Sequence, residues 1–198
     1  MPLHFAVPPP DSVAQLVGSL AREASGPIGL TASRSSLPPA SQTSPHPVFA
    51  LGLDDLAAGA GVEAARLVAW RYLLEADGGE WAAAEVYQVD QGTHRWGALN
   101  RGKHVKGTLD QLRTASADSR FAGIEYSVQL LRIPALSLGF LWLKAPEGTD
   151  DVFIPIAPTF PPFTVAQTYS GAELELLLKP LATERLKFDD TPRGAPGT

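Results

Sequence analysis

Cysteine is absent from this chain of 198 residues. Disulfide bonds, thiolate nucleophiles and metal centres with cysteine ligands are therefore excluded. None of the four histidines, His4, His46, His94 and His104, lies in the spacing of a zinc-binding pair, and no zinc-protease pattern follows any of them. We therefore predict no metal site and no cofactor.

A long, unbroken apolar segment is also absent. The most apolar stretch, 124–156, is interrupted by Arg132, Pro134 and Lys144, so it offers no run of about 18–20 apolar residues, as a transmembrane helix needs. The N-terminal residues lack the basic start and the apolar core of a secretory signal. The sequence thus predicts a cytoplasmic protein without a membrane span.

Basic residues are fewer than acidic ones: 16 Lys and Arg stand against 21 Asp and Glu, which gives a net charge of −5. This balance argues against general affinity for nucleic acids but is compatible with a local basic patch. The sequence has no G-x-S-x-G motif, and the adjacent pairs Asp54-Asp55 and Asp150-Asp151 suit turns better than acid–base catalysis, which needs separated carboxylates. We identify no catalytic residue and favour a non-enzymatic protein.

Proline and glycine are abundant, with 18 of each, and they divide the chain. Residues 1–47 form an N-terminal arm, in which apolar residues at helical spacing predict a helix over 13–24 and a Pro- and Ser-rich linker follows. We assign 48–188 to the folded domain and 189–198 to a flexible polar tail. The heavy use of Ala, Gly, Pro, Arg and Leu is typical of GC-rich bacterial genomes.

The centre of the folded domain is 124–156. Apolar and polar residues alternate over 126–130, as in a strand with one wet face, whereas both faces are apolar over 136–143, as in a covered central strand. Pro134 marks a turn between these strands. Residues 152–156 resume as a third strand, whose proline favours a sheet edge. The stretch predicts a three-stranded antiparallel meander.

Further elements flank this meander. Apolar residues at helical spacing predict a helix over 61–75, and 81–89 with 93–99 predict a hairpin. Capping-box patterns at Thr108 and Ser170 predict the starts of a short helix and of the last helix. We therefore predict an α+β fold, with a single antiparallel sheet of about five strands, in the order α-β-β-α-β-β-β-α, and helices packed on the sheet.

The most strongly charged stretch is 94–106, which runs into a predicted helix start. Cations beside the free amides of a helix N-terminus suit the binding of an anion. A tryptophan next to an arginine suits a protein interface or the stacking of a base. The candidate residues for binding an anion or a partner are Arg95, Trp96, Arg101, Lys103, His104 and Lys106.

These features predict a non-enzymatic protein–protein interaction or assembly module, whose extended arms dock on a partner or on another subunit of a homo-oligomer. Binding of an anionic ligand or of nucleic acid through 94–106 is the alternative. The second alternative is a small enzyme whose site is assembled from residues distant in sequence.

Overall fold

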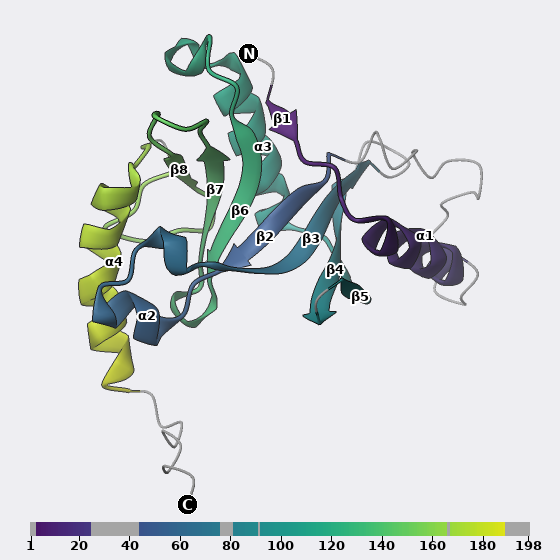
Figure 1. Ribbon diagram of the computed structural model, residues 1–198, viewed down its shortest axis with the longest axis horizontal. Coiled ribbons are helices and arrows are strands. Elements are labelled where there is room, and N and C mark those ends of the chain that lie inside the picture. Colours follow the sequence, from purple (N-terminus) through teal and green to yellow (C-terminus); the bar gives the residue numbers. More distant parts are fainter. Residues whose placement is uncertain (1–2, 25–43, 76–80, 91, 166, 189–198) are drawn as a thin grey trace, which may run out of the picture.

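The computed structural model describes residues 3–24, 44–75, 81–90, 92–165 and 167–188. Its centre is one mixed sheet of eight strands, in the order β5-β4-β3-β2-β6-β7-β8, with β1 paired to β6 (Figure 1). The strands are β1 (His4–Phe5), β2 (His46–Ala50), β3 (Arg66–Glu75), β4 (Trp81–Asp90), β5 (Thr93–Asn100), β6 (Ser127–Ile133), β7 (Leu138–Lys144) and β8 (Val152–Pro155). The α-helices are α1 (Pro10–Ala24), α2 (Leu53–Ala58), α3 (Lys103–Ala117) and α4 (Gly171–Leu186).

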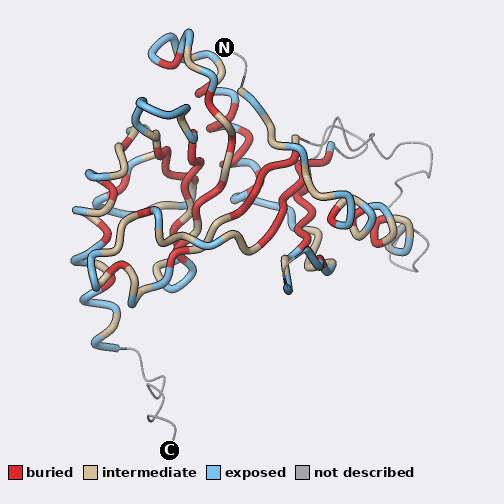
Figure 2. The backbone as a smooth tube through the Cα atoms, viewed as in Figure 1, coloured by how far each residue is buried: buried red, intermediate tan, exposed pale blue. Residues whose placement is uncertain are grey.

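Helix α3 packs on one face of the sheet, and the other three helices pack on the opposite face. The alternation of side chains along each strand explains this arrangement. In β3, Leu73 packs in a cluster with α3, whereas its neighbour Tyr72 packs in a cluster with α1. In β6, Leu130 lies on the α3 side and Leu131 on the side of α2 and α4. Figure 2 shows the resulting buried residues concentrated along the strands.

The predicted sheet of about five antiparallel strands is wrong. The sheet has eight strands and is mixed, because β1 and β2 both run parallel to β6. The two-residue β1 is too short for a periodic pattern, and β2 begins with His46 and Pro47, which fall in the predicted linker although both are buried. A parallel pair joined by a long connection also leaves no local turn signal.

The predicted helix over 61–75 is also wrong, because this segment forms a short 3-10 turn at Val62–Ala64 and then the strand β3. β3 packs between α1 and α3, so its apolar residues occupy both faces. Apolar residues on both faces also satisfy a helical spacing, and the pattern alone cannot separate the two structures. The β-formers Val68, Trp70 and Tyr72 were the better signal.

The start of α3 differs from the prediction by about one turn. The sequence places the helix start at the capping pattern of Thr108, but the helix begins at Lys103. The Thr108 hydroxyl lies inside the helix and donates to the His104 carbonyl at 2.8 Å. A capping-type residue can thus sit within a helix when its hydroxyl bonds to the preceding turn.

Several predicted elements are confirmed. β6, β7 and β8 form the antiparallel meander, with β8 at a sheet edge, and β4 and β5 form the hairpin. α1 matches the helix predicted over 13–24, and α4 begins with the capping box of Ser170 and Glu173. Within the described ranges, no helix is long and apolar enough to cross a membrane. Most of the predicted linker and the whole predicted tail lie outside the described residues.

Candidate anion-binding site

The candidate site lies where β5 passes into α3. Gly102 joins the two elements with a φ of 100°, a conformation that side chains disfavour. Its carbonyl accepts the first helical hydrogen bond, from the Lys106 amide at 3.1 Å, and no described side chain caps the helix. The amides of the first turn therefore lack intrahelical acceptors and carry the positive end of the helix dipole.

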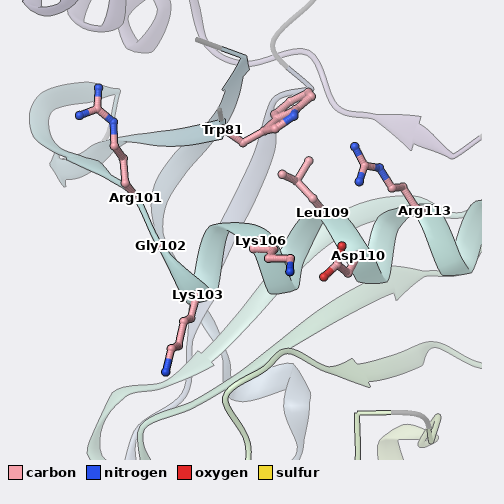
Figure 3. Close-up of a pocket in the computed structure, with 8 residues that line it drawn as sticks. All are labelled: Trp81, Arg101, Gly102, Lys103, Lys106, Leu109, Asp110 and Arg113. Atoms are coloured by element: carbon pink, nitrogen blue, oxygen red, sulfur yellow. The ribbon is translucent and has the colours of Figure 1, made fainter. Parts of the chain in front are cut away.

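A cleft of about 720 Å³ opens beside this helix start, and we call it the outer cleft. Four of its lining residues are basic and one is acidic, so the cleft is cationic. The lining residues are Trp81, Arg101, Gly102, Lys103, Lys106, Leu109, Asp110 and Arg113 (Figure 3). Those from α3 recur every three or four residues, which places them along one side of the helix.

Trp81 provides an aromatic wall for the outer cleft. It begins β4, is partly exposed and packs against the core beneath α3. Figure 3 shows the Trp81 ring above the helix, with Leu109 and Arg113 on the same side, whereas Lys103 points away from the ring. An aromatic ring close to basic side chains suits a ligand that combines a ring with a negative charge.

The six residues predicted for binding divide into two groups. Arg101, Lys103 and Lys106 line the outer cleft, and all three are exposed. His104 is exposed at the same helix start and lines a neighbouring cavity with Arg101. Arg95 and Trp96 lie on β5 and line neither hollow; Trp96 packs instead against the cluster beneath α1. The basic segment therefore contributes four of its six predicted residues to one region.

The neighbouring cavity has a volume of about 510 Å³ and shares Arg101 with the outer cleft; we call it the inner cavity. It lies over the sheet face that α3 covers, at the first turn of that helix. Its polar lining includes Arg71, Glu85, Asn100, His104, Arg132 and Ser137. The sequence analysis identified only His104 and Arg101 in this group.

Three charged side chains form a buried network in the wall of the inner cavity. Glu85 is 2% exposed and accepts a bidentate pair of hydrogen bonds from Arg132, one of them at 2.8 Å and the other from Nη2 to Oε1. Arg71, with a side chain 4% exposed, holds its Nε 3.6 Å from Glu85 Oε1, too far for a hydrogen bond. Arg71 Nη1 donates to the Thr108 hydroxyl at 3.2 Å, which links the network to α3.

The charges of this network follow from its surroundings. Burial acts to raise the pKa of Glu85, but the hydrogen bonds and the charge of Arg132, together with Arg71, hold that pKa below its ordinary value. Burial lowers the pKa of Arg71 to about 10, and Glu85 opposes the shift. Burial, and then the charge of Arg71, lowers the pKa of the adjacent His46 to about 3. At neutral pH both guanidiniums and the carboxylate are charged, and His46 is neutral.

The sequence carried a weak signal for this network. Arg71 and Glu85 are single charged residues inside otherwise apolar segments, LVAWRYLL and WAAAEVY. A lone charge in a buried strand needs a partner, because an unpaired buried charge is costly. Because the sequence predicted a helix over 61–75, in which Arg71 could face water, no buried partner for Arg71 was expected.

A metal centre finds no support in the described part of the chain, where no three His, Asp or Glu side chains gather as potential ligands. Comparison of the sequence and the structure with models of protein families, with curated proteins and with solved structures gives no significant match.

Proposed function

We propose that the protein binds a small anionic ligand of the nucleotide class in the outer cleft. The observation that carries this proposal is that one cleft is lined both by an aromatic side chain, Trp81, and by four basic side chains, of which Arg113 points to the same side of α3 as the ring (Figure 3). A nucleotide would place its base against Trp81 and its phosphates near the basic side chains and the first-turn amides. The volume of about 720 Å³ lies within the range of small-molecule sites.

The expected contributions favour a compact ligand with both features. Stacking of a base on an aromatic side chain contributes about 1–3 kcal/mol. A negative charge near an exposed helix N-terminus adds about 0.3–1 kcal/mol. A long nucleic acid gains less from this site, because only four of the 16 Lys and Arg residues line the cleft and the net charge of the chain is −5.

Isothermal titration calorimetry with ADP tests the proposal, with inorganic diphosphate as a probe that lacks the ring. We expect saturable binding of both, weakened by added salt because basic side chains hold the phosphates. Trp81→Leu should weaken ADP binding by roughly 5–150-fold, the equivalent of the stacking energy, and leave diphosphate binding unchanged. Absence of ADP binding at low salt, or indifference to Trp81→Leu, would refute the proposal.

A matched pair of arginine substitutions locates the site. Arg113→Ala removes a charge from the outer cleft, and Arg185→Ala removes one from an exposed position on α4. Arg113→Ala should weaken ADP binding by roughly fivefold, or about 1 kcal/mol, and Arg185→Ala should not change it. Equal effects of the two substitutions would indicate general charge attraction. Tighter binding of a short oligonucleotide than of ADP would favour nucleic acid as the ligand.

The second candidate function is a cytoplasmic protein–protein interaction or assembly module, and β5 favours it. This strand of eight residues ends the sheet, and none of the described strands pairs with its outer side. At the opposite edge, β8 is partly covered by two backbone hydrogen bonds between Phe153 and Tyr169. At the start of β5, the His94 amide already donates to the Asp11 carboxylate of α1 at 2.8 Å. The rest of this edge strand can pair with a strand of a partner or of a second subunit.

Sedimentation velocity over a range of concentrations, combined with hydrogen exchange, tests this second candidate. An assembly should form with rising concentration, and the amides of β5 should then exchange more slowly. A monomer at every concentration, with no binding partner recovered and unchanged exchange in β5, would contradict it.

A further inference from the structure

The inner cavity holds a buried positive charge that its described lining does not balance. Two guanidiniums, Arg71 and Arg132, face one carboxylate, Glu85, and the adjacent imidazole of His46 is fully buried and neutral. Both carboxylate oxygens of Glu85 accept hydrogen bonds from Arg132, so Glu85 interacts more weakly with Arg71. A buried charge without full compensation is unfavourable unless a further group of opposite sign approaches it.

The Arg71 side chain is held in place but has spare hydrogen-bonding capacity. It is 4% exposed, Nη1 is fixed by Thr108, and Nε has no hydrogen-bond acceptor among the described residues. Arg132 is 30% exposed and lines the same cavity. Guanidiniums offer paired donors that match the oxygens of a carboxylate or a phosphate.

The first turn of α3 adds donors to the same cavity. His104 and Val105 line it, and these residues belong to the turn whose amides lack intrahelical acceptors. The helix dipole has its positive end here, so it acts on an anion in the same direction as the two arginines. Two independent features thus favour negative charge at one place: the Arg71 guanidinium, which has an unpaired Nε donor, and the terminus of α3.

We propose that the inner cavity is a second binding site, distinct from the outer cleft, for the oxyanion group of a small molecule, either a carboxylate or a phosphate. Arg71 and Arg132 bind the oxyanion, and Glu85 holds the two guanidiniums apart and orients them. The two sites share Arg101, and both lie at the first turn of α3.

Gly139 offers a substitution that narrows the cavity beside Arg132 without altering its charges. It pairs with Arg132 across β6 and β7, so a side chain at this position would point to the same face as Arg132. A Cβ atom built on Gly139 meets nothing within 4 Å, and the residue lines the cavity. Gly139→Val, with a residue suited to a strand, therefore fills space that is otherwise empty.

The experiment uses the full chain with Lys106→Ala and Arg113→Ala, so that the outer cleft contributes little to anion binding. Inorganic phosphate and acetate are titrated separately against chloride at constant ionic strength. The readout is the NMR resonance of each arginine Nε–H group, which reports on Arg71 and Arg132 individually. We expect saturable shifts of both resonances with phosphate or with acetate, and the more effective anion identifies the class of the oxyanion.

Adding Gly139→Val to this chain should abolish the saturable shifts, whereas the arginine resonances should keep their dispersion because the network is intact. If Gly139→Val does not fold, Gly139→Ala replaces it and should weaken the binding. Equal shifts with chloride, or binding that persists in a folded Gly139→Val variant, would refute the proposal of an inner site. That result would leave ADP binding in the outer cleft unaffected, so the two proposals fail separately.

Discussion

Arg71 in β3 and Glu85 in β4 are buried charged residues, and the residues next to each of them in the strand are apolar. The surface pair of Asp118 and Arg120 also has a short hydrogen bond, at 2.7 Å, yet such surface pairs contribute only about 0–1 kcal/mol because water screens them. The buried network is different in kind. Arg71 and Glu85 are too deeply buried to be rehydrated without opening the core, so the charge of each depends on its partners in the network.

His46 gives this region a measurable dependence on pH. Its pKa is about 3 in the folded chain, lowered chiefly by burial, against an ordinary value of 6.5. Below pH 6.5 the unfolded chain binds a proton at His46 that the folded chain rejects, so this contribution to stability is complete above 6.5 and is lost as the pH falls toward 3. Between pH 7 and pH 5 the free energy of unfolding should fall by about 2 kcal/mol on account of His46.

Urea unfolding at the two pH values checks this prediction. His46→Gln should remove about 2 kcal/mol of the pH dependence, since its amide does not titrate in this range. The control is the parent chain, unfolded at the same two pH values. An unchanged slope in His46→Gln would contradict the burial of a neutral imidazole.

At the scale of elements, the sequence predicts best where a segment has one wet face or a defined boundary. The hairpin of β4 and β5, the meander of β6 to β8 and the capped start of α4 all meet one of these conditions. β3 meets neither, because helices cover both of its faces. The pairing of β2 was not predicted for a different reason. Its partner β6 lies far along the chain, and a parallel pairing has no sequence signature near the strand itself.

The close packing of α3 leads to a prediction at the element scale. A Cβ atom on Gly107 would lie 2.7 Å from the Ala157 carbonyl oxygen, whereas a Cβ atom on Gly18 in α1 would meet only the Arg22 side chain at 3.5 Å. Alanine favours a helix over glycine by about 1 kcal/mol. Gly18→Ala should therefore stabilise the protein by up to about 1 kcal/mol, and Gly107→Ala should destabilise it by roughly 1–3 kcal/mol through overpacking.

Chemical denaturation of the two variants under identical conditions measures both effects. Their opposite signs are the test, because helix propensity alone predicts stabilisation in each case. If Gly107→Ala also stabilised the protein, α3 would lie farther from the segment after β8 than the structure places it, and the inner cavity beside the first turn of α3 would have a different shape.

At the scale of the whole molecule, the candidate site was only partly accessible from the sequence. The basic stretch that ends at Lys106 is contiguous, so composition alone revealed it. Trp81 and Arg113 join it only through the packing of α3 on β4, and Arg71, Glu85 and Arg132 come from three strands. Residues that meet through strand pairing have no common signal in one sequence, which is why the inner cavity was not predicted.

The N-terminal arm provides the last prediction, because its described part packs on its own chain. β1 pairs with β6, and Leu16 and Leu20 of α1 are buried in a cluster with Tyr72. The Ser12 and Tyr72 hydroxyls also lie 2.7 Å apart and share a hydrogen bond. The sequence assigns this arm to 1–47, outside the folded domain and available to a partner, whereas these contacts indicate that its described part stabilises the domain.

Deletion of residues 1–24 decides between these expectations. Burial of Leu16 and Leu20 contributes roughly 3–6 kcal/mol, a large part of the about 5–15 kcal/mol that stabilises a typical protein. The shortened chain should therefore unfold at a lower urea concentration and bind a dye that detects exposed apolar surface.

A matched pair of substitutions in the full chain gives a second measurement. Leu16→Ala should lower the free energy of unfolding by about 2–5 kcal/mol, and Val17→Ala, at a position 52% exposed, should change it little. A shortened chain with an unchanged urea midpoint would show that the arm is dispensable and free to dock on a partner.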